Sequence, residues 1–272
     1  MTINCKGTLV DLSTPKIMGI LNCTPDSFYD GGNFKSDLDF LNQVEKMVHQ
    51  GATFVDVGAY SSKPGAEFVS EAEELKRLLV VVDLIVSRFP EMLLSIDTFR
   101  SAVAQKAIEQ GACLINDISA GSLDDKMMDT VGKLGIPYIM MHLRGTPQTM
   151  QNFTNYDHLF KEILFYFSEK IALAKQFGIN DLIIDPGFGF AKNLTQNYEL
   201  LQHLELFQHL ELPVLVGVSR KSMIYKVLET TVKESLNGTT VLNTIALIKG
   251  AKILRVHDVQ QAVECVQLCA RL

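Results

Sequence analysis

Leu182-Ile183-Ile184-Asp185-Pro186-Gly187-Phe188-Gly189-Phe190-Ala191-Lys192 is the stretch that decides the fold. It opens with a short apolar run of β-branched character, which is typical of a buried parallel strand. The run ends at the carboxylate of Asp185, and a proline with two glycines then turns the chain. A carboxylate at the carboxyl end of a buried strand, followed by such a loop, is typical of an active site in an α/β barrel. A tight βα turn with Asp185 as a helix cap is the alternative.

Seven further short apolar runs alternate with segments of helical period. The eight runs are residues 17–21, 54–57, 93–96, 113–115, 138–141, 182–184, 214–218 and 253–256. Segments 70–87, 156–177 and 259–272 carry apolar residues at 3–4 spacing, which predicts helices. Eight βα units predict a single domain over 1–272, an α/β protein of the (β/α)8 TIM-barrel class, with a doubly wound open sheet as the alternative. Weak alternation in residues 2–11 predicts a short N-terminal β-hairpin.

Composition excludes several classes of protein. The formal net charge of −6 argues against a nucleic-acid or membrane-surface binder. The first residues lack a signal-peptide pattern, and no apolar run approaches the roughly 20 residues of a membrane span, so we expect a cytoplasmic protein with no membrane partner. The five cysteines include no CxxC pair, which predicts free thiols rather than a metal site.

Polar residues follow the apolar runs at their carboxyl ends. In order of the runs they are Asn22, Gly58 with Asp56 inside its run, Asp97, Asn116 with Asp117, His142, Asp185, Ser219 to Lys221, and Arg255 with His257. The loops that lead from helices into strands show nothing comparable. The carboxyl ends of all strands meet at one face of a barrel, so these side chains are expected to converge there. A helix cap or a satisfied polar rim is the alternative for any one of them.

The converging groups indicate a ligand that has a flat heterocyclic part and a negatively charged part. Asn and Asp side chains match the donors and acceptors of a flat heterocycle. Lys221, Arg255 and His257 offer positive charge for a phosphate or carboxylate. A buried Asp beside these cations is expected to be ionised and able to stabilise a developing cation.

Two loops and one helix start extend this site. Residues 22–32 form a turn-rich loop in which Phe28 could cover a ligand, and 59–65 have a similar composition. Ser222 opens a predicted helix, where free N–H groups could hold a substrate carboxylate. Ordinary βα loops and a Ser N-cap are the alternatives.

The motifs taken together resemble the dihydropteroate synthase family over essentially the whole chain. They are, in order, Asn22-Cys23-Thr24-Pro25-Asp26-Ser27-Phe28 with Asp30-Gly31-Gly32, Ser95-Ile96-Asp97-Thr98, Ile115-Asn116-Asp117, the stretch from Asp185 to Lys192, Ser219-Arg220-Lys221-Ser222 and Arg255-Val256-His257-Asp258-Val259. The resemblance implies condensation of 6-hydroxymethyl-7,8-dihydropterin diphosphate with 4-aminobenzoate in folate biosynthesis. It also implies a Mg²⁺ requirement and a homodimer.

The resemblance further implies a role for each matching position. The pterin edge would be held by Asp97, Asn116, Asp185 and Lys221, with Met141 lining the pocket. The diphosphate would be bound by Asn22, Arg255 and His257, with Asn22 near the metal. The aminobenzoate site would contain Ser62, Phe190 and Ser222, closed by Phe28 and Lys63. The catalytic groups among these would be Asp97, Lys221, Arg255 and His257.

One segment departs from the family pattern. The family usually reads Glu-Ser-Thr-Arg-Pro-Gly where this chain has Tyr60-Ser61-Ser62-Lys63-Pro64-Gly65. Ser62 keeps the hydroxyl, but Lys63 loses the planar fork of Arg and Tyr60 removes an acidic charge. The departure bears on aminobenzoate and sulfonamide binding, and Lys63→Arg is expected to alter aminobenzoate affinity with little effect on pterin.

Two other functions remain open from the residues. A methyltransferase acting on methyl-tetrahydrofolate would share Asp97, Asn116 and Asp185 but would not need Arg255 and His257 for a diphosphate. A non-catalytic pterin-binding protein is the second, with aminobenzoate activity lost through the altered loop. Diphosphate release with and without 4-aminobenzoate separates all three.

Overall fold

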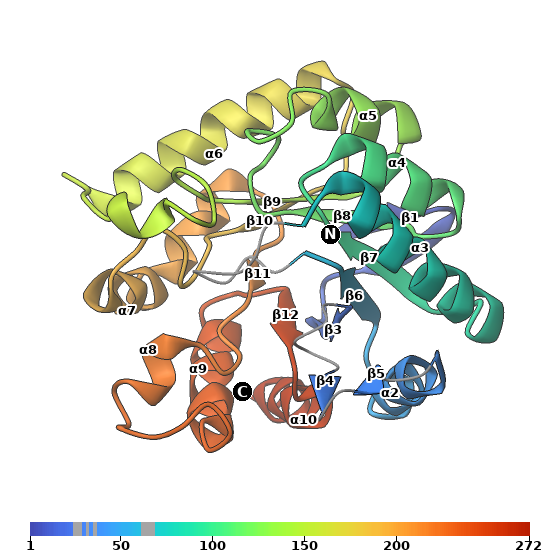
Figure 1. Cartoon of the computed structure of the whole chain (residues 1–272). Helices are drawn as coiled ribbons and strands as arrows, with labels where there is room; N and C mark the ends of the chain where they lie inside the picture. Colours follow the sequence, from blue (N-terminus) through green and yellow to red (C-terminus); the bar gives the residue numbers. More distant parts are fainter. Residues whose placement is uncertain (24–28, 31–32, 35–36, 61–68) are drawn as a thin grey trace.

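Eight parallel strands form a ring in the computed structural model, which describes residues 1–23, 29–30, 33–34, 37–60 and 69–272 (Figure 1). The strands are β3 (Lys16–Asn22), β6 (Phe54–Gly58), β7 (Leu93–Asp97), β8 (Leu114–Asp117), β9 (Tyr138–Met141), β10 (Leu182–Asp185), β11 (Leu215–Val216) and β12 (Ile253–Val256). Their order is β10-β9-β8-β7-β6-β3-β12-β11, and a parallel bridge between Ile184 and Val214 joins the last strand to the first. The predicted barrel is therefore confirmed, and the open sheet is excluded.

Helices surround the ring on its outer side (Figure 1). They are α2 (Asp37–His49), α3 (Glu71–Arg88), α4 (Ser101–Glu109), α5 (Met127–Leu134), α6 (Leu159–Gln176), α7 (Leu194–Gln202), α8 (Ser222–Tyr225), α9 (Leu236–Ile248) and α10 (Val259–Cys269). Short 3₁₀ helices span Met150–Asn152 and Leu204–Leu210. The three predicted helical segments correspond to α3, α6 and α10, although α10 ends at Cys269, three residues before the predicted end.

Helix α3 shows why these segments are helical. The Ser70 side chain caps it by accepting a hydrogen bond from the backbone N–H of Glu73, and acidic residues fill its first turn. Leu78, Val82 and Ile85 recur on one face and are fully buried. The apolar stripe therefore turns inward and fixes the helix against the barrel.

The predicted hairpin lies across the amino-terminal end of the barrel. Strands β1 (Thr2–Cys5) and β2 (Thr8–Asp11) pair antiparallel. Ile3, Cys5 and Val10 from the hairpin are buried in one cluster with inward-facing residues of seven strands. A second antiparallel pair joins β4 (Tyr29–Asp30) to β5 (Asn33–Phe34). The N-terminal hairpin, β1 and β2, closes one end of the barrel and leaves the opposite end for a ligand.

Strand alternation divides the interior into an apolar and a polar layer. The apolar layer, which packs on the hairpin, contains Met18, Phe54, Leu114, Ile139, Ile183, Leu215 and Ile253. Successive side chains of a strand point to opposite faces, so the residues two positions later also point inward, one step closer to the carboxyl ends. These residues are Ile20, Asp56, Asn116, Met141, Asp185, Gly217 and Arg255. The site is therefore the layer directly above the apolar core.

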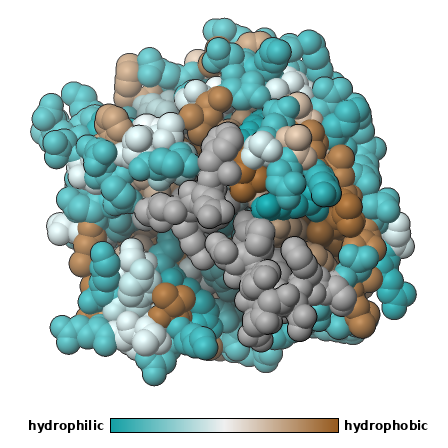
Figure 2. Space-filling model, in the orientation of Figure 1, coloured by the Kyte–Doolittle hydropathy of each residue, from teal (hydrophilic) through white to brown (hydrophobic). Residues whose placement is uncertain are grey.

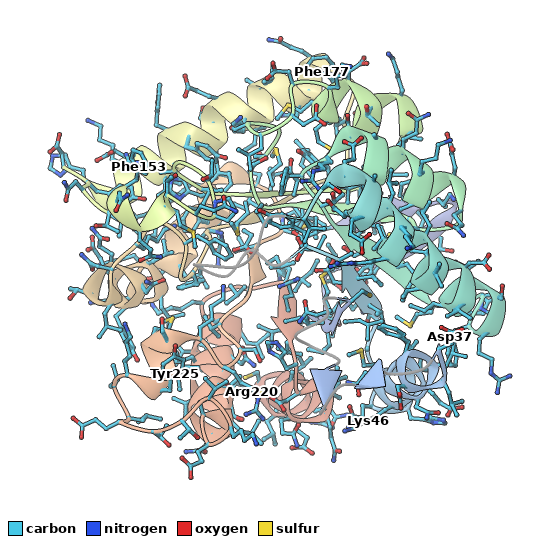
Figure 3. The ribbon with its side chains drawn as sticks, in the orientation of Figure 1. Asp37, Lys46, Phe153, Phe177, Arg220 and Tyr225 are labelled. Atoms are coloured by element: carbon cyan, nitrogen blue, oxygen red, sulfur yellow. The ribbon has the colours of Figure 1, made fainter. Side chains whose placement is uncertain are left out.

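The face of the molecule that Figure 2 shows is mostly hydrophilic. In the orientation of Figure 1, the described residues of this face are predominantly polar, with apolar patches mainly on the right (Figure 2). Phe153 and Phe177 are partly exposed and lie near the two ends of α6 (Figure 3). None of the helices in the described ranges combines the length and the apolar character that a membrane span requires.

Candidate active site

A buried ion-pair cluster forms one side of the polar layer. Arg255 donates from Nε to Oδ2 of Asp56 at 2.6 Å and from Nη2 to Oδ2 of Asp97, also at 2.6 Å. Asn116 donates from Nδ2 to the same Oδ2 of Asp56 at 2.9 Å. Four strands thus contribute to one connected cluster, and three of its four members were predicted site residues.

The turn after β10 forms the other side. The Asp185 Oδ1 atom accepts a hydrogen bond from the backbone N–H of Gly187 at 2.8 Å, which fixes the carboxylate at the strand end. Gly187 has φ +73°, and a Cβ atom there would lie 2.3 Å from the backbone oxygen of His142. The glycine is therefore required both by backbone conformation and by the close approach of the next strand.

Lys221 reaches this turn from the following strand. Its Nζ atom donates to the backbone oxygen of Phe188 and lies 4.8 Å from the ring centroid of Phe190. The side chain is only partly exposed. A Cβ atom on Gly217 would lie 3.9 Å from Lys221 Nζ and 3.8 Å from the Cβ atom of Arg255, which are ordinary contact distances. Lys221 and Arg255 therefore both lie beside Gly217.

Burial and pairing shift the titration of these groups. Burial raises the pKa of Asp97 to about 7, although Arg255 pulls it down. Burial also raises the pKa of Asp185, against the opposing effect of Lys221. Lys221 has its pKa lowered to about 8 by burial, with Asp185 acting in the opposite direction. Burial alone would lower the pKa of Arg255, but Asp56 and Asp97 raise it above its ordinary value.

The pKa of Asp97 qualifies the prediction that buried acids of this site are ionised. The carboxylate loses more hydration on burial than the single contact to Arg255 restores. Its charge therefore changes close to neutral pH, and any role that depends on an ionised Asp97 becomes pH-dependent in that range.

Apolar side chains lie beside these polar groups. Met141 is 3% exposed and lies in a small cluster with partly buried Phe99 and Phe190. Met141 pairs with Asp185 across β9 and β10, so this apolar cluster lies next to the Asp185 carboxylate. A planar heterocycle is the kind of ligand that fits such a combination.

His257 and Ser219 lie at the ends of neighbouring strands. The hydroxyl of Ser219 is 3.1 Å from Nδ1 of His257 and accepts from the backbone N–H of His257 at 3.2 Å. The His257 side chain is exposed at the rim, where an anion that enters from solvent can reach it.

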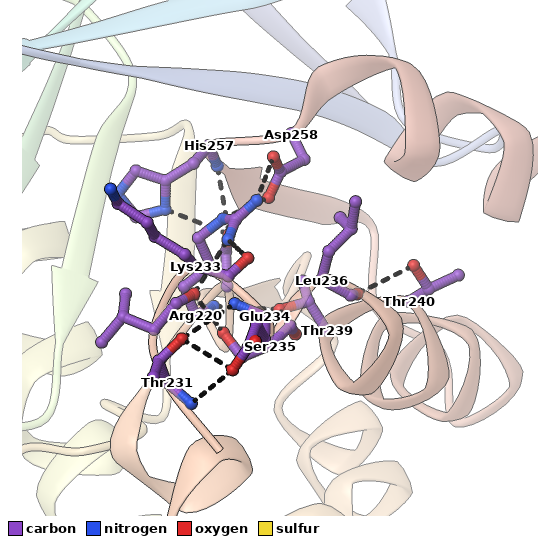
Figure 4. Close-up of polar contacts among 12 residues, drawn as sticks. Arg220, Thr231, Lys233, Glu234, Ser235, Leu236, Thr239, Thr240, His257 and Asp258 are labelled. Atoms are coloured by element: carbon purple, nitrogen blue, oxygen red, sulfur yellow. Dashed lines mark hydrogen bonds and ion pairs between the residues drawn. The ribbon is translucent and has the colours of Figure 1, made fainter.

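Arg220 differs from its neighbours in the Ser219-Arg220-Lys221-Ser222 motif. Its guanidinium forms a bidentate pair with Asp258 and donates to the backbone oxygens of Val232 and Lys233 (Figure 4). Its backbone has φ +54°, a left-handed conformation that turns the side chain away from that of Lys221. The predicted convergence of the strand-end polar residues therefore does not include Arg220, which holds the loop before α9.

Asp117 and His142 also follow their strands but lie outside the cluster. Asp117 is fully buried and accepts hydrogen bonds from Tyr138 and Ser119, because it is one residue after Asn116 and points to the other face. His142 is 2% exposed, with Nδ1 3.0 Å from Nζ of Lys192. Desolvation lowers the pKa of His142 well below its usual value, and the Lys192 charge acts in the same direction.

Sequence reasoning noted Asp56 inside its apolar run but assigned no role in the site to it or to Lys192. Asp56 was treated as part of the strand, although counting two residues from the apolar Phe54 places it on the inward face. Lys192 is 3% exposed and donates to Nδ1 of His142 and to the backbone oxygens of Gly187 and Phe190, each at 3.0 Å. No signal in the linear sequence distinguished this buried lysine from a solvent-exposed one.

The remaining predicted residues lie at the rim or outside the described ranges. Asn22 ends β3 beside Gly58 of β6. Ser222 opens α8, but this helix has only four residues, so a helix dipole adds little to anion binding there. Phe28, Ser62 and Lys63 fall outside the residues that the structure describes.

Tyr60 is the one residue of the altered segment, 60–65, that lies within the described ranges. Its hydroxyl accepts a hydrogen bond from Nε2 of Gln148 at 2.7 Å, and its ring meets Phe99 edge-on with centroids 5.2 Å apart. The tyrosine that replaces the family's usual acid therefore joins the end of β6 to the loops after β7 and β9.

The chain is similar to known proteins over its full length. A family model described as pterin binding enzyme matches residues 18–257. The dihydropteroate synthase of Escherichia coli K12 is 45% identical over 270 residues, which cover 98% of this chain and 95% of that protein. The dihydropteroate synthase of Haemophilus influenzae is 43% identical over 261 residues, or 95% of this chain and 94% of the relative.

Solved structures give the same result. The Yersinia pestis dihydropteroate synthase in complex with a sulfonamide drug has a TM-score of 0.94 and 42% identity, covering 100% of this chain and 98% of that one. The Xanthomonas albilineans dihydropteroate synthase with 4-aminobenzoic acid has a TM-score of 0.92 and 34% identity, covering 99% and 97%.

Proposed function

The chain belongs to the pterin-binding enzyme family, and we propose how its residues divide the dihydropteroate synthase reaction among the parts of one pocket. It is a transferase that condenses 6-hydroxymethyl-7,8-dihydropterin diphosphate with 4-aminobenzoate and releases 7,8-dihydropteroate and diphosphate, a step of folate biosynthesis. The reaction needs a heterocycle pocket, an anion site and room for an aromatic amine.

The pterin edge is assigned to Asp97, Asn116, Asp185 and Lys221, with Met141 lining the pocket. The support is that Asn116 and Asp185 point into the same barrel layer and that Asp97 is linked to Asn116 through Arg255 and Asp56. In addition, Lys221 shares a turn with Asp185. Carboxylates accept from the ring N–H and amino groups of a pterin, and Lys221 donates to an oxygen.

The diphosphate is assigned to Arg255, His257 and Asn22. Arg255 is held by Asp56 and Asp97, so an arriving diphosphate competes with Asp97 for the guanidinium. Release of Arg255 from Asp97 would free that carboxylate for the pterin. The diphosphate would therefore bind Arg255 and the pterin would bind Asp97, which are the two partners of a single ion pair.

The reaction then does not need a strong general base. The C–O bond to the leaving diphosphate breaks, and Arg255 and His257 neutralise the departing charge. Asp97 stabilises the positive charge that develops on the pterin methylene group. The amine lone pair of 4-aminobenzoate forms the C–N bond, and the arylamine then loses one proton to solvent. Lys221 keeps the heterocycle oriented throughout.

The aminobenzoate site is assigned to Phe190 and Ser222, with Ser62, Lys63 and Phe28 from the two loops. Phe190 is partly buried beside Lys221, and its ring offers a flat apolar surface for an arylamine. Exchange of Lys63 for Arg tests the loop assignment: aminobenzoate affinity is expected to change, while pterin affinity is not.

A magnesium ion fits this donor set. Within the described ranges no cluster of three or more His, Cys, Asp or Glu could hold a metal ion. Mg²⁺ commonly binds through one or two protein oxygens together with substrate phosphates, so a dedicated protein cage is not expected. Asn22 would supply the protein ligand, and the ion would neutralise charge on the diphosphate.

Joint placement of Asp97, Asn116 and Arg255 in one hydrogen-bonded cluster carries these assignments. The experiment measures diphosphate release from pterin diphosphate and Mg²⁺, with and without 4-aminobenzoate. Aminobenzoate-dependent release is expected. Tight pterin binding without such release would favour a non-catalytic pterin-binding protein, and methyl transfer from methyl-tetrahydrofolate would favour the methyltransferase.

We also propose a single-domain homodimer located in the cytoplasm. One barrel includes strands from Lys16 to Val256, and the amino-terminal hairpin packs against its amino-terminal end, which supports a single domain. Val241 and Ile248 lie on the outer face of α9 and are half or more exposed, as is Leu268 on α10. Such apolar residues suit a subunit interface. All five cysteines are free thiols, which suits a reducing compartment.

A further inference from the structure

Asp56 occupies the centre of the ion-pair cluster without being assigned to any substrate. It is fully buried, and its Oδ2 atom accepts hydrogen bonds from both Arg255 Nε and Asn116 Nδ2. Its Oδ1 atom is buried and has no hydrogen-bond partner among the described residues. Because one oxygen of this carboxylate accepts two hydrogen bonds, the carboxylate is held firmly in one orientation.

We propose that Asp56 is a positioning residue that fixes which way Asn116 presents its amide to the heterocycle. The inference rests on the assignment of Asn116 to the pterin edge. An amide side chain can turn over about its last bond and exchange its oxygen and nitrogen, with little change in shape. An ionised carboxylate only accepts, so Asp56, paired with Arg255, requires the nitrogen of Asn116 on its side.

The fixed orientation determines the pattern offered to a ligand. Asn116 is 4% exposed, and its Oδ1 atom has no hydrogen-bond partner within the described part of the chain. Asn116 therefore presents two groups to a ligand in a fixed order, the acceptor Oδ1 and the second N–H of Nδ2. The reversed amide would leave Oδ1 facing the Asp56 carboxylate, where two acceptors repel.

This order selects among flat heterocycles of nearly the same shape. A pterin carries an amino group next to a ring nitrogen without hydrogen, which is a donor followed by an acceptor. A lumazine carries an oxygen and a ring N–H at the same two positions, which is the reverse. The fixed amide therefore favours the pterin, since a mismatched edge leaves buried polar groups unpaired.

The test compares the affinities of 6-hydroxymethylpterin and 6-hydroxymethyllumazine by calorimetry. The unaltered protein is expected to prefer the pterin. Asp56→Asn is expected to reduce that preference about tenfold or more, because the new amide also donates and lets Asn116 reverse. Asn116→Asp alone places two carboxylates against each other and is expected to bind the pterin weakly.

The double variant Asp56→Asn with Asn116→Asp is the decisive one. The amide introduced at position 56 donates to the carboxylate introduced at position 116, which again offers an acceptor to the pocket. The preference for the pterin is expected to recover above that of either single variant. Arg255 has lost the same charged partner in Asp56→Asn and in the double variant, so recovery reports the orientation at position 116.

A matched control separates this role from stability. Asp117→Asn removes a buried carboxylate on the adjacent position of β8, whose partners are Tyr138 and Ser119. It is expected to lower the melting temperature and to leave the heterocycle preference intact.

An unchanged preference in Asp56→Asn, or a double variant no better than the singles, overturns the inference alone. Failure of the unaltered protein to bind 6-hydroxymethylpterin overturns the proposed pterin site and the inference with it.

Discussion

Single residues of the pocket act under opposing effects of burial and charge. Asp97 and Lys221 both lose hydration at the carboxyl end of the barrel, so the acid becomes harder to ionise and the base easier to deprotonate. The partners Arg255 and Asp185 offset part of each change. The charges that the reaction uses therefore exist together only in a limited pH range.

Pterin affinity is expected to fall at both acidic and alkaline pH, which gives its pH dependence an acidic and an alkaline limb. Asp97, with its pKa raised to about 7, becomes protonated and neutral as pH falls below 7, and Lys221, with its pKa lowered to about 8, becomes neutral as pH rises above 8. Affinity measured by calorimetry should fall on both sides. Asp97→Asn should remove the acidic limb, and an acidic limb that persists in this variant would assign it to another group.

Asp185→Asn is expected to weaken pterin binding by roughly ten- to a hundredfold. The change replaces a charge-assisted acceptor, worth about 1.5–3 kcal/mol, in a poorly solvated pocket. Calorimetry measures the effect, with Asp83→Asn on the exposed face of α3 as the matched control. Unchanged affinity would remove Asp185 from the site.

At the scale of elements, the turn after β10 is held from two sides. Lys221 donates to Phe188 from the pocket, and Lys192 donates to Gly187, Phe190 and His142 from behind. Gly187 in turn donates to Asp185. The orientation of the Asp185 carboxylate therefore depends on a lysine that does not itself enter the pocket.

Lys192→Met should loosen this turn. The methionine fills the space but leaves the backbone oxygen of Phe190 and the ring nitrogen of His142 without a donor, at about 1–3 kcal/mol for each unpaired group. The backbone oxygen of Gly187 keeps only its hydrogen bond from the N–H of Phe190. Both the melting temperature and the pterin affinity should fall, the latter by about tenfold. The exposed Lys161→Met is the control, and full pterin affinity in Lys192→Met would show that the turn orients Asp185 without the lysine.

On the scale of the whole molecule, the two ends of the barrel have different tasks. The hairpin and the apolar layer fill the amino-terminal end, and the polar groups occupy the other. The outer faces of α9 and α10 carry exposed apolar side chains that the barrel itself does not cover. The apolar core and the polar site thus lie at opposite ends of the barrel, and the proposed subunit interface lies on the outer faces of α9 and α10.

Ile248→Glu is expected to shift the protein from dimer to monomer. Ile248 is 63% exposed on α9, and a charge at the centre of an apolar interface must be desolvated on association. Light scattering after size-exclusion chromatography measures the mass. The exposed Val80→Glu on α3 is the control, and an unaltered dimer in Ile248→Glu would place the interface elsewhere.

Much of the fold followed from local pattern. The eight apolar runs, the helical periods and the hairpin depend on alternation and on 3–4 spacing, which are local properties of the chain. The carboxyl ends of strands could likewise be recognised, so Asp97, Asn116, Asp185 and Arg255 were identified as candidates before any coordinates. Their convergence followed from one assumption, that the sheet closes.

Only the tertiary structure decided which strand-end residues face one another. Asp56 is 60 residues from Asn116 and 199 from Arg255 along the chain, and closure of the ring brings their side chains into hydrogen-bond contact. The same closure leaves Arg220 with Asp258, and Lys192 with His142, outside the pocket. Sequence by itself determined the elements and the polar end of each strand. Which of these polar side chains contact one another depended on distances across the barrel, and no local pattern encodes those distances.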